Sequence, residues 1–128
     1  MQHAELTEKI IGCSYRVYNR MGGGFLECVY AKCMMIELGK AGLQAESEKP
    51  ITVRYDNEIV GEFFADIVVE DTVIVELKAV KETAQAHEVQ LVNYLVATGK
   101  PVGLLLNFGP VQVEVKRKVR ELRPTNLA

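Results

Sequence analysis

The sequence has 128 residues, a length that fits one domain of ordinary size over residues 1–128. Proteins that bind nucleic acid nonspecifically are usually strongly basic, and the net charge of −2 differs from that pattern. No apolar run approaches the roughly 18 residues that a membrane span needs, and the first ten residues are polar and charged. We therefore expect a cytoplasmic protein with no membrane partner.

Two helices are predicted in the first forty residues. Apolar side chains at helical spacing favour a helix from about residue 4 to residue 20, and the glycines at 22–24 end it. A second helical pattern runs from about residue 25 to residue 40, with Tyr30, Cys33 and Ile36 on its expected apolar side.

From Lys49 the apolar period changes to two, which is typical of strands. The predicted strands cover about residues 49–55, 58–69, 73–80, 102–107 and 111–116.

A third helix is predicted from about residue 83 to residue 98, before Gly99 as its cap. We expect Val89, Val92, Leu95 and Val96 to form its core side. A helix at this place permits a crossover between parallel strands. The order of helices, three strands, one helix and two strands predicts an α/β fold with a mixed β-sheet flanked by helices.

Three charged residues lie in strands that are otherwise apolar. Asp66 follows Phe63-Phe64-Ala65. A buried carboxylate is energetically costly unless a partner charge or hydrogen bond stabilises it or its pKa shifts. Glu76 and Lys78 are two apart in the next strand and so share one face.

The turn between these strands decides whether the two carboxylates meet. A three-residue loop, 70–72, would pair Val69 with Val73 and place Asp66 across from Glu76. Carboxylates that close repel one another unless a proton or a cation lies between them. A two-residue turn would instead place Asp66 across from Val75. The alternative interpretation is a buried Asp66–Lys78 salt bridge.

Four further polar residues are candidates with ordinary structural alternatives. Gln90 and Tyr94 are four apart, so they can project from the third helix toward one cleft. They could equally be held by packing, and His87 on the same stripe could be a surface residue. Glu27, at the start of the second helix, could simply interact with the helix dipole.

Together these residues resemble the PD-(D/E)XK nuclease superfamily, in the RecB-like branch. Asp66 and Glu76-Leu77-Lys78 resemble its central motif, with Ala65 where the name has proline. The segment Gln90–Tyr94 resembles the Q-h-x-x-Y motif. Gly24-Phe25-Leu26-Glu27-Cys28-Val29-Tyr30 is similar to the signature of the GxxExxY proteins.

The resemblance implies Mg²⁺-dependent hydrolysis of phosphodiester bonds, most often in DNA, with Mn²⁺ able to substitute. Asp66, Glu76, the main-chain carbonyl of Leu77 and Glu27 (directly or through water) would hold the metal. Lys78 would activate the attacking water. Gln90 would position the nucleophile or a phosphate, Tyr94 would pack beneath the site or contact the substrate, and Tyr30 would be structural.

Two functions, with different partners, remain open. One is an active nuclease, for which a homodimer could supply a larger DNA surface. The other is a catalytically inactive nucleic-acid-binding or protein-interaction module that retains the fold. Basic residues near the C-terminal end could contact phosphates or could be a solvated strand end: Lys116, Arg117, Lys118, Arg120 and Arg123.

Overall fold

The structure is a computed structural model that describes residues 3–120. Its helices are α1 (Ala4–Met21), α2 (Glu27–Lys40) and α3 (Gln85–Thr98). Its strands are β1 (Ala45–Tyr55), β2 (Glu58–Val69), β3 (Val73–Lys78), β4 (Val102–Phe108) and β5 (Val113–Val119). The predicted order of elements is confirmed. Within residues 3–120, no helix is long and apolar enough to cross a membrane.

The five strands form one mixed sheet in the order β1-β2-β3-β4-β5. Strands β3 and β4 are parallel and are connected through α3, whereas the other neighbours are antiparallel. Val69 pairs with Val73, which confirms the register expected for a three-residue loop. The mixed α/β fold is therefore as predicted.

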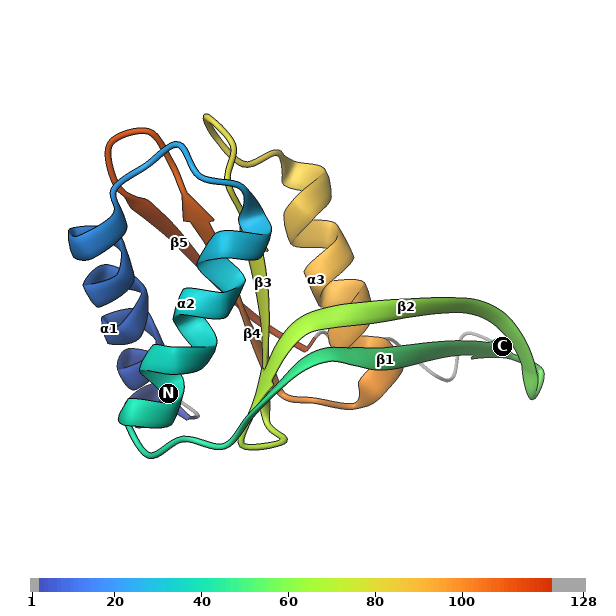
Figure 1. The fold of residues 1–128 in the computed structure, drawn as a ribbon. Coiled ribbons are helices and arrows are strands. Elements are labelled where there is room, and N and C mark those ends of the chain that lie inside the picture. The colour runs from blue at the N-terminus through green and yellow to red at the C-terminus, as the bar shows by residue number, and fades with distance from the viewer. Residues whose placement is uncertain (1–2, 121–128) are drawn as a thin grey trace.

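Helices cover both faces of the sheet, with α1 and α2 on one side and α3 on the other (Figure 1). The alternation along β3 explains this layering. Val73, Val75 and Leu77 belong to the core beneath α1 and α2, whereas Ile74 belongs to the core beneath α3. Side chains of a strand alternate between the two faces, so Glu76 and Lys78 lie on the α3 side.

The core side of α3 differs from the prediction. Its buried residues are Leu91, Tyr94 and Leu95, whereas Val89 is 52% exposed. Gly103 on β4 gives the physical reason, because a Cβ atom there would lie 2.7 Å from Cδ1 of Leu91. The missing side chain lets α3 approach the sheet on its Leu91 side. That orientation brings Tyr94 toward the strands.

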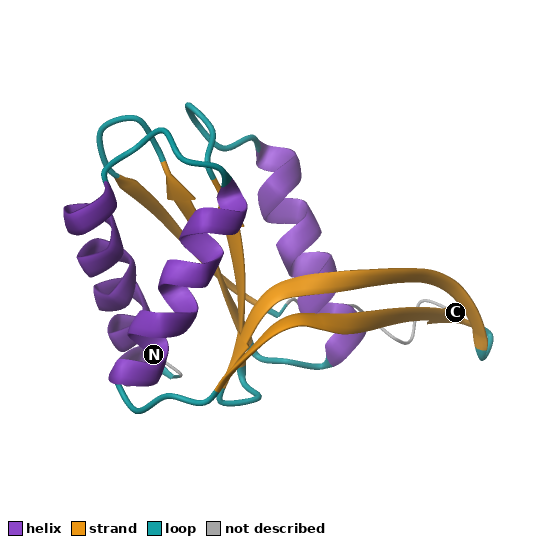
Figure 2. Ribbon diagram, in the orientation of Figure 1, coloured by secondary structure: helices purple, strands orange, loops and turns teal. Residues whose placement is uncertain are grey.

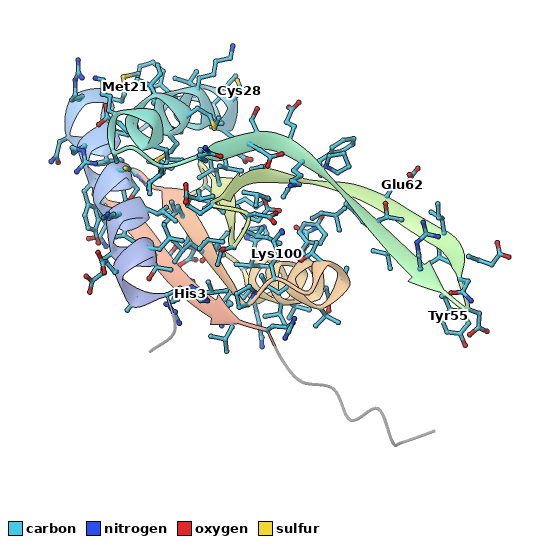
Figure 3. All side chains as sticks on the ribbon, turned by 90° about the horizontal axis from the view of Figure 1, so that it is seen from below. His3, Met21, Cys28, Tyr55, Glu62 and Lys100 are labelled. Atoms are coloured by element: carbon cyan, nitrogen blue, oxygen red, sulfur yellow. The ribbon has the colours of Figure 1, made fainter. Side chains whose placement is uncertain are left out.

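The β1–β2 hairpin extends well beyond the rest of the sheet. It curves past α3 and away from α1 and α2 (Figure 2). Strand β3 pairs with β2 only at residues 67–69, so the preceding part of β2 has β1 as its only backbone neighbour among the described strands. Figure 3 shows Tyr55 and Glu62 on this extended part. The sheet is thus open at Asp66, where β2 and β3 separate.

Candidate active site

Asp66 and Glu76 meet where the backbone pairing of β2 and β3 stops. The last paired residues are Ile67 and Val75. One step further, the backbone N–H of Asp66 donates to Oε2 of Glu76 at 2.9 Å, and the N–H of Leu77 donates to Oδ2 of Asp66 at 2.8 Å. Each carboxylate therefore accepts a hydrogen bond from the backbone of the opposite strand, and the predicted juxtaposition is confirmed.

The environment of Glu76 opposes its ionisation. The residue is only 7% exposed. Burial and then the negative charge of Asp66 raise the pKa of Glu76 from its ordinary value of 4.5 to about 8. Without a cation, the carboxyl group therefore keeps its proton at neutral pH. A cation placed between the two groups would remove the repulsion.

Lys78 lies on the same face as Glu76, at the end of β3. Its positive charge acts to lower the pKa of Glu76, against the larger effects that raise it, which indicates that the two side chains are close. No salt bridge joins Lys78 to Asp66, although the structure describes both residues. The interpretation of these charges as a buried Asp66–Lys78 ion pair is therefore wrong.

Asn107 of β4 fixes the chain just after Lys78. The backbone N–H of Val80 donates to Oδ1 of Asn107 at 2.9 Å, and Nδ2 of Asn107 donates to the carbonyl oxygen of Val80 at 2.9 Å. Asn107 is itself 1% exposed. A paired amide of this kind replaces strand pairing where β3 has ended. It holds the segment that follows the Glu76-Leu77-Lys78 motif.

Glu27 is the first residue of α2, and Tyr30 fixes the loop that leads to it. The Tyr30 hydroxyl donates to the carbonyl oxygen of Gly22 at 2.6 Å and accepts from the N–H of Phe25 at 3.3 Å. The Tyr30 ring stacks on Phe108 with ring centres 4.4 Å apart. These contacts confirm a structural role for Tyr30. They also determine where Glu27 enters the site.

The residues of α3 separate into two groups. Tyr94 is 7% exposed, and burial, then the charges of Glu76 and Asp66, raise its pKa. It therefore lies beside the carboxylate pair. Gln90 is exposed at the surface of α3. Nδ1 of His87 accepts a hydrogen bond from the N–H of Ala84 at 3.1 Å, so His87 caps the start of α3 and is not a site residue.

A groove of about 650 Å³ opens between α2 and the start of β1 and reaches Asp66. Glu27, Asp66 and Leu77 line one part of it. Its remaining lining residues were not found by sequence reasoning: Cys28, Ala31, Lys32, Met35, Ile36, Ser47 and Glu48.

Glu48 is the most notable of the residues that sequence reasoning missed. Ser47 pairs with Ile67 and Lys49 pairs with Ala65, so Glu48 stands at the level of Asp66. The ladder omits this pair because Glu48 has a left-handed φ of 51°. Only the register of the β1–β2 hairpin, which the sequence did not determine, could have identified it.

The donor atoms at this site fit Mg²⁺. The two carboxyl groups face each other, and without a cation that of Glu76 stays protonated. Mg²⁺ usually binds one or two carboxylates and completes its coordination with water and phosphate oxygens. Within residues 3–120, no three His, Cys, Asp or Glu side chains are grouped closely enough to hold a metal by themselves. Glu27 therefore lines the groove without joining Asp66 and Glu76 in a three-carboxylate cluster.

The basic residues of β5 are partly engaged in structure. Nζ of Lys118 lies 2.5 Å from a carboxylate oxygen of Glu88 on α3. The Arg120 guanidinium donates to the carbonyl oxygen of Gly99. Arg123 lies outside the described residues. These contacts support the interpretation of this region as a strand end that also braces α3.

Comparisons with known proteins identify the family. The family described as PD-(D/E)XK nuclease superfamily matches residues 4–118. The chain belongs to the PD-(D/E)XK nuclease superfamily. A solved structure described as "Crystal structure of SSO0001" has a similar fold, with a TM-score of 0.59 and 17% sequence identity. The match covers 94% of this chain and 60% of that one. A comparison with curated protein sequences finds no match.

Membership of the PD-(D/E)XK superfamily gives the geometry a chemical context. The superfamily name describes nucleases, and its members generally use divalent metals. The facing carboxylates and the adjacent lysine of this chain are suited to such chemistry.

Proposed function

We propose that the protein is a Mg²⁺-dependent nuclease that hydrolyses phosphodiester bonds in DNA, and that it belongs to the GxxExxY group of the RecB-like branch. One observation carries the proposal above all. Asp66 and Glu76 face each other across two strands, and burial together with the charge of Asp66 raises the pKa of Glu76 to about 8. A protein keeps such a costly pair when a cation is to be bound there.

Asp66, Glu76 and the main-chain carbonyl of Leu77 would hold the metal. Glu27, which lines the groove but does not join the two carboxylates in a cluster, would contribute through water. Bound Mg²⁺ would polarise the scissile phosphate and lower the pKa of a coordinated water. Mn²⁺ would support the same reaction.

The other site residues act on the water and on the phosphate. Lys78, on the face of Glu76, orients or deprotonates the attacking water and stabilises the negative charge that develops on the phosphate. Gln90 is exposed on α3, where it can position the nucleophile or a phosphate. Tyr94, whose pKa the charges of Glu76 and Asp66 help to raise, would pack beneath the site or contact the substrate.

Cleavage assays test this function. Purified protein is incubated with single-stranded, linear and plasmid DNA, with and without Mg²⁺ or Mn²⁺. We expect metal-dependent cleavage that Lys78→Ala lowers by about 10²-fold or more. Lys81→Ala is the matched control, because Lys81 is an exposed lysine just beyond β3. DNA that stays intact under every condition, or equal loss in the two variants, contradicts the proposal.

A second candidate is an inactive nucleic-acid-binding or protein-interaction module. It is favoured by the lack, within residues 3–120, of three carboxylates grouped at metal-binding distance. Calorimetry with Mg²⁺ and Mn²⁺ separates the two functions. The nuclease requires metal binding that Asp66→Asn abolishes, with Asp56→Asn in the β1–β2 turn as the control. An inactive module predicts no heat of metal binding in any of the three proteins.

A further inference from the structure

The groove that reaches Asp66 has one long wall, which α2 provides. Residues Cys28, Ala31, Lys32, Met35 and Ile36 line it, and their spacing places them on one stripe of the helix. A different stripe enters the core, with Tyr30, Met34 and Leu38 fully buried. Helix α2 therefore has two apolar sides. On the second side, Ala31 and Met35 pack in part against the edge of the core, whereas Ile36 is 59% exposed.

The charges of the groove differ from those of a surface that follows a DNA duplex. Duplex binding relies on several Lys or Arg contacts to the phosphates. Lys32 is the one basic residue among the groove's lining, all of which lies in the described part of the chain. The acidic lining residues Glu27, Glu48 and Asp66 would repel a phosphate backbone, except where a metal is bound.

The apolar wall suits a nucleobase whose face is free. In a duplex the faces of the bases are stacked and hidden, whereas an unpaired base can lay its face on apolar side chains. A groove of about 650 Å³ is also in the size range of pockets that enclose a small ligand, and a nucleotide is such a ligand. Met35 and Ile36 provide the apolar surface.

Lys32 lines the same groove as Glu27 and Asp66. It is five residues beyond Glu27, or about 7.5 Å along the helix axis at 1.5 Å per residue. That distance is comparable to the separation of successive phosphates in an extended strand. Because Lys32 and Asp66 line the same groove, a phosphate next to the cleaved one would contact the Lys32 ammonium while its base lies toward Ile36.

We propose that this groove seats an unpaired nucleotide beside the cleaved bond, so that single-stranded DNA or an unpaired DNA end is the substrate class. Lys32 binds its phosphate, and Met35 and Ile36 contact its base. The identity of the reacting bond rests on the proposed nuclease function. The preference for an unpaired strand rests on the groove alone.

Binding measurements test the preference without requiring cleavage. Fluorescence anisotropy compares a labelled single strand with a blunt hairpin duplex of the same sequence, in Mg²⁺ and in a Lys78→Ala background. We expect the single strand to bind at least tenfold more tightly. Ile36→Glu should remove most of that difference. Val60→Glu is the matched control, since Val60 is 63% exposed on the β1–β2 hairpin and does not line the groove.

A lysine pair tests the phosphate contact. Lys32→Ala should weaken single-strand binding and lower the salt dependence by about 0.7 in the slope of log K against log salt, which corresponds to one phosphate contact. Lys9→Ala on α1 is the control, because Lys9 is exposed and does not line the groove.

Each outcome bears on one of the two proposals. Duplex binding as tight as single-strand binding, no binding of either DNA, or equal effects of Ile36→Glu and Val60→Glu would overturn the groove proposal. If the wild-type protein cuts blunt duplex faster than single strands, the nuclease function stands and the groove proposal fails. If DNA binds with the expected preference but is never cut, the groove proposal stands and the nuclease function fails.

Discussion

The backbone N–H of Asp66 donates a hydrogen bond of 2.9 Å to Oε2 of Glu76, one step beyond the last backbone pair of β2 and β3. The two strands part at this point, and side-chain oxygens take the places that carbonyl oxygens occupy in a regular ladder. The site is thus formed by an interruption of the sheet. Because the two carboxyl groups are held by the backbone, they are close before any metal binds.

The pH dependence of the metal-free protein should reflect Glu76. Its pKa is about 8 in the folded protein and about 4.5 in the unfolded chain. At any pH between 4.5 and 8, Glu76 is therefore protonated in the folded state and ionised in the unfolded state. The contribution of Glu76 to stability therefore falls as the pH rises from about 4.5 to about 8. Glu76→Gln removes this charge and should stabilise the protein at pH 8, by on the order of 2 kcal/mol.

Urea unfolding in EDTA at pH 5 and pH 8 measures this effect. The control is Glu62→Gln, since Glu62 is exposed on the extended hairpin. A Glu76→Gln variant that is no more stable than the wild type at pH 8 would contradict the assignment.

Metal binding should release a proton from the same group. At pH 7 a carboxyl group of pKa about 8 is mostly protonated, so Mg²⁺ should displace about one proton per ion bound. At pH 9.5 the release should be close to zero. Calorimetric titrations in buffers of different ionisation enthalpy count the protons. Equal release at both pH values would show that another group titrates.

Removal of the Tyr30 hydroxyl should loosen the entry to α2. Tyr30→Phe leaves the carbonyl oxygen of Gly22 and the N–H of Phe25 without this partner, at a cost of about 1–2 kcal/mol. Since Glu27 follows this loop, cleavage should also weaken. Thermal unfolding and cleavage rates are measured beside Tyr15→Phe, whose hydroxyl is on an exposed ring of α1. A loss of the same size in Tyr15→Phe would refute the role of Tyr30.

Asn107→Ala should weaken both the fold and the site. It removes both hydrogen bonds to Val80, and the cost of buried groups left without partners is about 2–3 kcal/mol. The segment after Lys78 then loses its clamp, so kcat should fall more than DNA affinity. Asn19→Ala, at an exposed position of α1, serves as the control in urea unfolding and kinetics. A stable Asn107→Ala variant with unchanged kcat would exclude this positioning role.

Most elements could be predicted from the sequence because their signals are local. Apolar periodicity identified the helices and strands, and Gly99 ends α3 with a left-handed φ of 75°. The meeting of Asp66 and Glu76 was also predictable, since it depends on one short loop whose length fixes the register.

What could not be predicted depends on contacts between distant segments. The pattern of α3 allowed several apolar sides, and Gly103, on another strand, selected the side that includes Leu91 and Tyr94. Ile36 was expected on the apolar side of α2, yet it is 59% exposed and lines the groove. A second apolar stripe on a helix cannot be distinguished from a core stripe by spacing alone.

The two amide hydrogen bonds at the parting of β2 and β3 also bear on which ion the site selects. One oxygen of Asp66 and one of Glu76 are each engaged by a backbone N–H, which leaves one oxygen of each free for coordination. This arrangement favours coordination through a single oxygen of each carboxylate. Calcium favours more ligands and bidentate carboxylates, whereas magnesium accepts a few single oxygens and retains its waters. At the proposed metal site, the two hydrogen bonds would therefore favour Mg²⁺ over Ca²⁺.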